Sequence, residues 1–518
     1  MNKKVTILWT DDEIDLLRPH ILLLEERGFD VYTASNGEDA IALIEERDFD
    51  LIFLDENMPG MTGLQVLSRL KTLKPNIPVV MITKSEEEDI MDEAIGSKIA
   101  DYLIKPVNPK QVLLTIKKFI DTKRLVSEKV TENYQSEFGK IGLMFNEQPD
   151  WQGWTEIYRK LVFWELELSD SGNSSMGEVF KMQKSEANQE FARYIRTHYA
   201  GWFGQAIGDR PLLSPDLFKH RIYPLIQEGD PVIWMVIDNL RFDQWKTIEP
   251  LIREYYTVAK EELVFSILPT ATQFARNAQF AGLMPFEISK LFPSLWTEDF
   301  EEGGKNLHEE ELLRQQINRL GADVPFIYDK INNNRSGKRW VENPQQLADV
   351  PLAVLVYNFV DMMSHSRTEM QMMRELAEDE EAYRSLTRSW FEHSPLFELL
   401  RELSLLKVKV VITTDHGTIQ VQNPVKVIGD RQTTTNLRYK QGKNLNYNPR
   451  EVVIFNPEEI HLPKPNLSTK YIFAYGSDFF AYPNNYHHYV KYYHNTFQHG
   501  GVSLEEMIIP LVVLQPKS

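Results

Sequence analysis

The first 121 residues alternate short apolar runs with segments of helical periodicity. The apolar runs lie at 5–10, 31–35, 51–55, 79–83 and 101–106, and the helical patterns lie at 16–27, 38–46, 64–73, 87–95 and 110–119. Strands that alternate with helices in this way indicate βαβ units, which join parallel strands by right-handed crossovers. The pattern therefore predicts an α/β domain over residues 1–121, with a doubly wound sheet of the flavodoxin-like type.

The pattern changes after residue 121 and changes back near residue 215. Residues 122–214 contain no strand pattern but hold long amphipathic stretches at 154–168 and 178–203, which predict a helical connector. Apolar strand runs then return at 231–239, 261–270, 351–361, 408–417, 471–476 and 505–514. The predicted organisation is an N-terminal domain over 1–121, a helical bundle over 122–214 and a second α/β domain over 215–518.

Composition narrows the classes of function. The chain has 518 residues, a formal net charge of −18 and no cysteine. The lack of cysteine excludes disulfides, thiolate catalysis and cysteine-ligated zinc, so a metal would need Asp, Glu, His or hydroxyl ligands. The negative charge argues against general binding of duplex DNA, and hence against a DNA-binding transcription factor. No run approaches the roughly 18 apolar residues of a membrane span, so we expect a cytoplasmic protein without direct membrane insertion.

Polar residues follow four strands of the first domain at their carboxyl ends, where open parallel sheets bind ligands. They are Asp11 and Asp12 after the first strand, Asp55 at the third, Thr83 at the fourth and Lys105 at the fifth. Grouped carboxylates suit Mg²⁺, and a threonine and a lysine beside them could hold the oxygens of a phosphoryl group on Asp55. A single acid at a strand end is often only a helix cap, but the five residues together favour a phosphorylation site.

The segments LDENMPGMTGLQVL, MITKS and YLIKP, together with the two adjacent aspartates, resemble a response-regulator receiver domain. The resemblance covers essentially all of residues 1–121. It implies that a sensor histidine kinase is the partner and that Asp55 accepts the phosphoryl group. It also implies Mg²⁺ bound by Asp11, Asp12, Asp55 and the carbonyl of Asn57, and a switch formed by Thr83, Tyr102 and Lys105.

A second set of polar residues follows the strands of the C-terminal domain. The set consists of Asp238, Thr270, Thr272, Asp361, His365, Asp415, His416 and His499. Asp and His without Cys are the oxygen and nitrogen donors of hydrolytic zinc sites, and Gly417 leaves room for a ligand or metal to approach. Two zinc ions about 4 Å apart could hold the attacking and leaving oxygens of a phosphoryl transfer. A single aspartate–histidine pair is more often a salt bridge or a turn, so only the full set favours a metal site.

The order of these residues resembles the alkaline phosphatase superfamily and, within it, the PglZ-type domain. The resemblance covers roughly 215–518. It implies one zinc on Asp238, Thr272, Asp415 and His416, and a second zinc on Asp361, His365 and His499. It also implies that Thr272 is the nucleophile, with Thr270 two residues upstream as the alternative.

A receiver, a helical connector and a PglZ domain in this order resemble the PorX-type response regulators. This resemblance implies a cytoplasmic protein that dimerises on phosphorylation and is linked to type IX secretion, with secretion components and a sigma factor as candidate partners. It also implies a di-zinc phosphodiesterase acting on small cyclic or linear oligonucleotides. The alternative is a non-catalytic signalling protein whose metal domain docks partners.

The segment 424–450 is locally basic and follows the second aspartate–histidine pair. It would form a cationic surface that contacts an anionic substrate beside the metals, although an ordinary surface loop explains the charges equally well. Arg276 lies one helical turn beyond Thr272 and would add a positive charge near the phosphate. The predicted substrate-binding residues are Arg276, Arg431, Arg438 and Lys440.

Overall fold

The computed structural model describes residues 4–74, 77–84, 99–171, 174–298, 304–358, 360, 379–429, 433–482 and 486–517. The chain forms two compact units, Met1–Asn133 and Tyr134–Ser518. Each unit has its own sheet and its own apolar core clusters.

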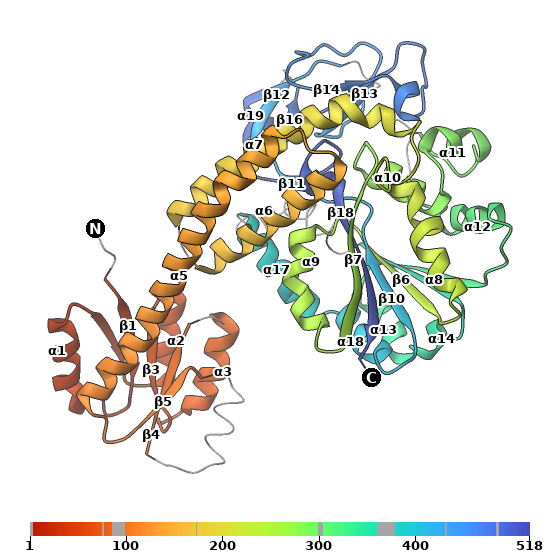
Figure 1. Ribbon diagram of the computed structural model, residues 1–518. Coiled ribbons are helices and arrows are strands. Elements are labelled where there is room, and N and C mark those ends of the chain that lie inside the picture. The colour runs from red at the N-terminus through yellow and green to blue at the C-terminus, as the bar shows by residue number, and fades with distance from the viewer. Residues whose placement is uncertain are drawn as a thin grey trace. The chain divides into compact units, whose positions relative to one another are not determined.

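The smaller unit contains a parallel sheet of five strands in the order β2-β1-β3-β4-β5 (Figure 1). The strands are β1 Thr6–Thr10, β2 Asp30–Ala34, β3 Leu51–Asp55, β4 Val79–Thr83 and β5 Asp101–Ile104. Both β3 and β4 are buried along their whole length, as central strands of a parallel sheet covered on both faces should be. This is the flavodoxin-like order, with the switch point between β1 and β3, so the predicted fold of this domain is confirmed.

Helices cover both faces of this sheet. They are the short 3₁₀ helix η1 Ile14–Leu17, α1 Arg18–Glu26, α2 Gly37–Glu46, α3 Gly63–Leu73 and the start of α5 Pro109–Asn146. One core cluster lies under α2 and α3, and another lies under α1 and α5. The start of α2 is set by Asn36, which accepts a hydrogen bond from the backbone of Asp39. The predicted helix at 87–95 lies outside the described residues.

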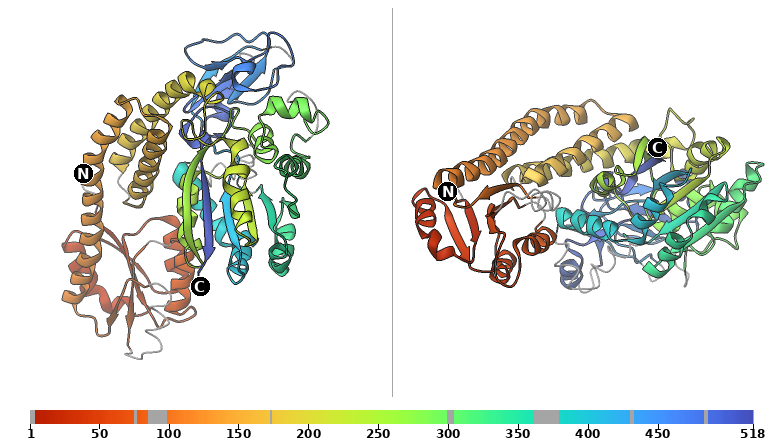
Figure 2. Two further views of the ribbon diagram at one scale, coloured as in Figure 1. Left: turned by 45° about the vertical axis from the view of Figure 1, so that its right-hand side comes forward. Right: turned by 90° about the horizontal axis from the view of Figure 1, so that it is seen from below.

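The connector consists of three long helices (Figure 2). Helix α5 continues to Asn146 and is followed by α6 Trp151–Ser171 and α7 Ser174–Trp202. Helix α6 packs on α7, and the hydroxyl of Tyr134 in α5 donates a hydrogen bond to Gln183 in α7 over 3.0 Å. A helical connector is therefore confirmed. Because α5 is continuous across residue 121, the predicted boundary at that point falls inside a helix.

The larger unit is built on a mixed sheet of six strands in the order β7-β18-β10-β6-β9-β8. The strands are β6 Val232–Ile237, β7 Tyr256–Phe265, β8 Phe326–Ile331, β9 Leu352–Tyr357, β10 Lys409–Thr413 and β18 Ile508–Pro516. Strands β10, β6, β9 and β8 are parallel, and β18 is antiparallel to its neighbours β10 and β7. The sequence predicted all of these strands except β8, where Asp329 and Lys330 interrupt the apolar pattern at the edge of the sheet.

The larger unit contains further helices, most of which flank this sheet, whereas α19 (Tyr486–Tyr493) packs against one of the small sheets (Figure 1). They are η2 Ser214–Asp216, η3 Phe218–Ile222, α8 Tyr223–Gln227, α9 Phe242–Ile252, α10 Thr272–Ala281, α11 Pro285–Leu291, α12 Glu309–Arg319, α13 Asn334–Glu342, α14 Gln345–Ala348, α17 Glu380–Glu392, α18 Pro395–Leu403, η4 Pro457–Ile460, α19 Tyr486–Tyr493 and α20 Leu504–Met507. Helix α10 ends at Gly282, whose φ of 61° is a left-handed conformation that glycine adopts without strain. None of the described helices in the chain has the length and hydropathy needed to cross a membrane.

Three small sheets stand beside the large one, paired as β11-β17, β12-β16 and β13-β15-β14. Their strands are β11 Ile419–Gln420, β12 Asn423–Lys426, β13 Tyr439–Gly442, β14 Val453–Phe455, β15 Lys470–Phe473, β16 Asp478–Ala481 and β17 Phe497–Gln498. Only β15 was predicted. The other strands have two to four residues, which is too short for a periodic pattern to be recognised.

The pairing of β6 with β10 decides where the chemistry of the larger unit lies. The two strands are parallel neighbours, and Val236 of β6 is aligned with Thr413 of β10. Asp238 and Asp415 each follow two residues later. Because the carboxyl ends of parallel strands meet at one edge of a sheet, this register brings the two acids together.

Ile412→Ala in β10 should destabilise the larger unit. The side chain of Ile412 is fully buried in a strand that is paired with β6 and β18, so its truncation removes contacts and leaves a cavity. We expect the free energy of unfolding, measured by urea denaturation, to fall by about 2–5 kcal/mol. Leu405→Ala is the control, because that side chain is 80% exposed and its loss should change stability by less than about 0.5 kcal/mol. Equal effects of the two substitutions would contradict the packing of this core.

Candidate functional site

Three carboxylates lie together at the carboxyl ends of β1 and β3. Asp11, Asp12 and Asp55 each place an oxygen within 4.8 Å of the other two. Asp11 and Asp55 are buried, whereas Asp12 is exposed, so the group is accessible from one side. Grouped carboxylate oxygens with access to water suit Mg²⁺, and this acid triad fits the predicted magnesium site.

Lys105 lies between two members of the acid triad. Its Nζ is 2.9 Å from Oδ2 of Asp11 and 2.9 Å from Oδ1 of Asp55. Burial raises the pKa of Asp55; the hydrogen bond from Lys105 opposes this shift and the charge of Asp11 adds to it. Burial lowers the pKa of Lys105, but its bonds to the two acids outweigh that effect and raise it. The lysine therefore stays charged next to the predicted phosphoacceptor.

The hydroxyl of Thr83 donates a hydrogen bond to the carboxylate of Glu56, and both side chains are buried. The sequence interpretation missed Glu56, although an acid directly after Asp55 was a usable signal. Tyr102 is 40% exposed and Asn57 is exposed. The switch role of Tyr102 and the magnesium contact of the Asn57 carbonyl stay predictions.

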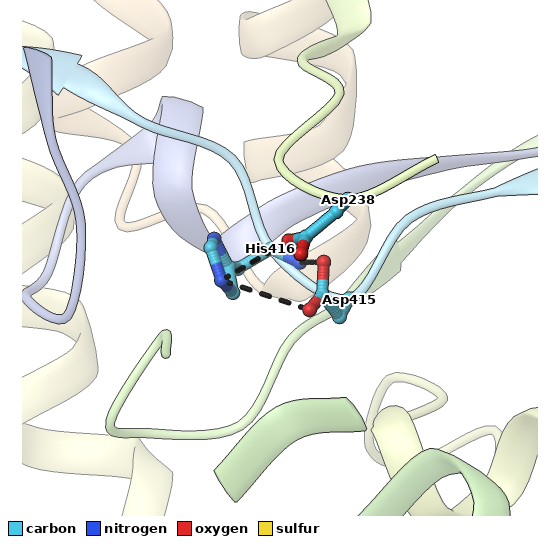
Figure 3. A group of neighbouring side chains, drawn as sticks. All are labelled: Asp238, Asp415 and His416. Carbon is cyan, nitrogen blue, oxygen red and sulfur yellow. Dashed lines mark hydrogen bonds and ion pairs between the residues drawn. The ribbon is translucent and has the colours of Figure 1, made fainter. Parts of the chain in front are cut away.

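Asp238, Asp415 and His416 converge where β6 and β10 end (Figure 3). Nε2 of His416 lies 3.9 Å from Oδ1 of Asp238 and 3.7 Å from Oδ2 of Asp415. All three residues are at most 2% exposed. Two carboxylates and one imidazole, with ligand atoms within 4.8 Å of one another, form a sulfur-free donor set that fits zinc.

Main-chain contacts fix the ring of His416 and the turn around it. The ring Nδ1 is 3.0 Å from the carbonyl oxygen of Gly417, and we assign the proton to Nδ1 from this bond. Nε2 is then the nitrogen that can bind a metal at the cluster. A Cβ on Gly417 would lie 2.0 Å from the carbonyl oxygen of Glu505, so this turn requires glycine.

Of the two candidate threonines, Thr272 lies at the cluster. It is the first residue of α10, and its Oγ1 is 3.1 Å from Nε2 of His416. Thr270 is fully buried, donates to the carbonyl of Gly501 and accepts from the backbone N–H of Gly500. Thr270 is thus held by loop backbone, and of the two hydroxyls that of Thr272 contacts the cluster.

Of the three residues predicted for a second zinc, His499 lies in the part of the chain that the structure describes. Asp361 and His365 lie outside the described residues. The rings of His499 and His416 stack with centroids 4.2 Å apart and planes 17° apart. Nδ1 of His499 is 3.1 Å from the carbonyl oxygen of Thr270, a contact that orients the ring as the Gly417 carbonyl orients His416. The structure thus brings His499 to the cluster, and the second zinc position stays a prediction.

Arg276 is 2% exposed and contacts the cluster of Asp238, Asp415 and His416 from within the protein. Its guanidinium donates to Oδ2 of Asp238 and Oε1 of Glu309, both over 2.7 Å, and to Oδ1 of Asn358 over 3.3 Å. Burial lowers the pKa of Arg276, but the carboxylates of Asp238 and Glu309 outweigh this effect and raise it. These contacts orient Asp238, a candidate metal ligand, and count against the substrate contact predicted for Arg276. Glu309 and Asn358 were not predicted, because each lies far from Arg276 in the sequence.

Two of the basic residues predicted to contact substrate are also buried. Arg438 is 0% exposed and pairs with Glu506, and Lys440 is 1% exposed and donates to the carbonyl of Thr434 over 2.8 Å. Neither side chain reaches the surface, so the cationic surface predicted for 424–450 does not include them. Arg431 lies outside the described residues.

Three parts of the chain match known protein families. Residues 7–117 match the response regulator receiver domain, residues 124–203 match the PorX response regulator linker domain, and residues 217–514 match the BREX system PglZ alkaline phosphatase-like domain. The PglZ match alone covers more than half of the chain.

Individual relatives match shorter stretches. The chain is 36% identical to the transcriptional regulatory protein ZraR of Klebsiella oxytoca over 140 residues, which is 27% of this chain and 32% of ZraR. It is 37% identical to the transcriptional regulatory protein SrrA of Staphylococcus aureus over 111 residues, 21% of this chain and 46% of SrrA. The chain thus spans less than half the length of these relatives. Among solved structures, chemotaxis protein CheY4 of Vibrio cholerae is 28% identical with a TM-score of 0.22, over 23% of this chain and 99% of CheY4.

A receiver joined to a domain with a buried aspartate–histidine cluster defines a two-component response regulator with an alkaline phosphatase-like domain. The helical segment between the two is the more specific feature. With a linker of the PorX kind between a receiver and a PglZ domain, the chain belongs to the PorX-type response regulators. A receiver domain implies a cognate histidine kinase as its partner.

Gly417→Ala should disrupt the turn that carries Asp415 and His416. The added Cβ would collide with main-chain atoms of Glu505, which cannot rotate away as a side chain could. We expect the free energy of unfolding to fall by about 1–3 kcal/mol and zinc retained after dialysis, measured by metal analysis, to decrease. Gly142→Ala in α5 is the control, because a Cβ there meets nothing within 4 Å. Undiminished zinc retention by Gly417→Ala would contradict the requirement for glycine at the turn.

Proposed function

We propose that this protein is a phosphorylation-regulated zinc phosphodiesterase. The observation that carries the proposal is the position of Thr272, whose hydroxyl lies 3.1 Å from Nε2 of His416 in a buried cluster of carboxylates and imidazole. A hydroxyl beside metal-binding donors is the arrangement that nucleophilic phosphoryl transfer needs. The match of residues 217–514 with an alkaline phosphatase-like domain supports the same class of reaction.

Two sets of residues would hold two zinc ions. The first set is Asp238, Thr272, Asp415 and His416, and the second is Asp361, His365 and His499. When bound, zinc would supply the positive charge that stabilises a phosphoryl group and lowers the pKa of a neighbouring hydroxyl. Arg276 occupies Oδ2 of Asp238 and thereby leaves Oδ1 directed toward His416.

Thr272 would carry the covalent step. Its Oγ1 forms a bond to phosphorus while the bond between phosphorus and the leaving oxygen breaks, and the hydroxyl proton ends on the leaving oxygen. Water then cleaves the bond between phosphorus and Oγ1 and restores the hydroxyl. The hydrogen bonds of Thr270 with the backbone of Gly500 and Gly501 support the choice of Thr272 over Thr270.

The proposed substrates are small cyclic or linear oligonucleotides, and the proposed setting is the regulation of type IX secretion in the cytoplasm. Both rest on the resemblance to the PorX type, which the match of residues 124–203 with the PorX linker supports. Secretion components and a sigma factor are proposed partners on the same ground. Because the chain carries a net charge of −18, an anionic substrate would depend on positive charge concentrated at the metal site.

Thr272→Val should abolish hydrolysis while it preserves the fold. The first zinc should bind more weakly but remain detectable, because Thr272 is one of its four proposed ligands and Asp238, Asp415 and His416 are unchanged. Valine has nearly the shape of threonine but lacks the nucleophilic oxygen, so kcat for bis-p-nitrophenyl phosphate should fall by about three orders of magnitude or more. Thr272→Ser is the matched control, because it keeps a hydroxyl and should retain measurable turnover. Zinc content and kcat would be measured on the same preparations.

The result also separates the enzyme from the non-catalytic alternative. Two zinc ions per chain with turnover that does not depend on Thr272 would contradict the proposed nucleophile. Two zinc ions with no turnover of any phosphodiester would favour a protein whose metal domain only docks partners. A wild-type chain that binds no zinc would overturn the proposal as a whole.

Phosphorylation of Asp55 should promote a homodimer. A phosphoryl group on Asp55 would attract Lys105 and draw Thr83 away from Glu56, which would reorganise the receiver face around Tyr102. Beryllofluoride with Mg²⁺ mimics this state, and sedimentation at micromolar protein should then show dimers for wild type but not for Asp55→Asn. Unchanged sedimentation of the wild type would contradict the proposed switch.

A further inference from the structure

Arg438 and Glu506 form an ion pair in the interior of the larger unit. The guanidinium of Arg438 donates to the carboxylate twice, from Nη2 to Oε2 over 2.6 Å and from Nε to Oε1 over 3.1 Å. Both side chains are 0% exposed. A paired and fully buried arginine cannot contact a substrate, so the pair must serve the protein in another way.

Glu506 contacts both of the loops that carry the clustered histidines. Its Oε1 accepts a hydrogen bond of 2.9 Å from the backbone N–H of Gly501, two residues after His499. Its backbone carbonyl accepts a hydrogen bond of 3.1 Å from the N–H of Gly417, the residue after His416. One residue therefore holds the two histidine loops at a fixed separation.

Arg438 forms the surface on which the loop of His499 lies. A Cβ on Gly501 would be 2.8 Å from Nη2 of Arg438, and a Cβ on Gly500 would be 2.7 Å from the ring of Tyr439. Gly500 has a φ of 120°, which side-chain-bearing residues rarely adopt. Gly501 therefore lets the loop approach Arg438 closely and Gly500 lets it approach Tyr439, so the position of this arginine helps to define the path of the loop.

The relative position of the loops decides the relative position of the imidazoles. The two rings stack with centroids 4.2 Å apart. Nδ1 of His416 is held by the backbone carbonyl of Gly417, and Nδ1 of His499 is held by the backbone carbonyl of Thr270. With both rings oriented by the main chain, a shift of either loop moves a donor nitrogen. A buried charge without its partner is costly, so loss of either member of the Arg438–Glu506 pair should force such a shift.

We propose that Arg438 and Glu506 are positioning residues that set the separation of His416 and His499 and thereby the affinity of these histidines for zinc. This inference rests on the proposed function, because it takes His499 as a zinc ligand. It replaces the substrate contact predicted for Arg438 with a role at the metals. Glu506, which has no access to substrate, is expected to matter as much as Arg438.

The test compares Glu506→Gln and Arg438→Lys with matched changes in a second ion pair. Arg221 and Glu262 are also joined by two hydrogen bonds, of 2.6 and 2.9 Å, and among the described residues neither forms a hydrogen bond or ion pair with a histidine loop. Zinc per chain and zinc affinity would be measured by chelator competition, and the visible spectrum would be recorded with Co²⁺ in place of zinc. KM and kcat would be measured for bis-p-nitrophenyl phosphate and for a dinucleotide.

Wild type should bind two zinc ions, and Glu506→Gln and Arg438→Lys should each bind one of them about 10- to 100-fold more weakly. The Co²⁺ spectrum should lose the contribution of that site. The ratio of the two KM values should not change, because no substrate contact is removed. Glu262→Gln and Arg221→Lys should behave as wild type in all of these measurements.

Thermal unfolding would show whether the single variants fold. If they do not, the double variant Arg438→Met/Glu506→Gln removes both charges and keeps an acceptor for the N–H of Gly501. It should still bind one of the two zinc ions more weakly than wild type. Full zinc affinity in a folded variant would overturn the inference, as would a higher KM for the dinucleotide alone with both zinc ions retained. A wild type that fails to bind two zinc ions would instead refute the proposed function.

Discussion

The parallel pairing of β6 with β10 is the constraint on which the cluster of Asp238, Asp415 and His416 depends. Its register aligns Val236 with Thr413, and Asp238 and Asp415 leave the sheet side by side two residues later. Both strands are buried along their whole length. A slip of one residue would turn every side chain to the opposite face and separate the two acids. The helix that begins at Thr272 can then supply its hydroxyl to a position that the sheet has already defined.

Burying a carboxylate is unfavourable unless its charge is paired. In this protein, buried basic side chains pair with buried carboxylates at several places. Arg276 pairs with Asp238 in the aspartate–histidine cluster, and Arg438 pairs with Glu506 next to the loops that carry His416 and His499. In the receiver, Lys105 does the same for Asp55. Because each of these bonds also restricts how a carboxylate can turn, the groups that stabilise buried charge are the groups that set the geometry of the two sites.

Local pattern was enough to predict most of both large sheets. The receiver strands are short apolar runs that end in polar residues, and the polar ends were correctly grouped because parallel strands end at one edge. In the larger unit, strand ends marked a wider set of polar residues, and the resemblance to the PglZ-type domain grouped Asp238 with Asp415 and His416. Local pattern failed for β8, an edge strand in which Asp329 and Lys330 break the pattern, and for most of the strands of two to four residues, which are created by pairing with distant segments.

The sequence by itself determined the order of domains, the α/β class and the residue types that could bind metal, because these depend on periodicity and on strand ends. Only the tertiary structure shows that the hydroxyl of Thr272 contacts His416, whereas the hydroxyl of Thr270 contacts loop backbone. The tertiary structure also shows that Arg438 is buried. A charged residue looks the same in sequence whether it faces water or an acid, and the acid that pairs with Arg438 lies 68 residues away, so folding alone brings them together.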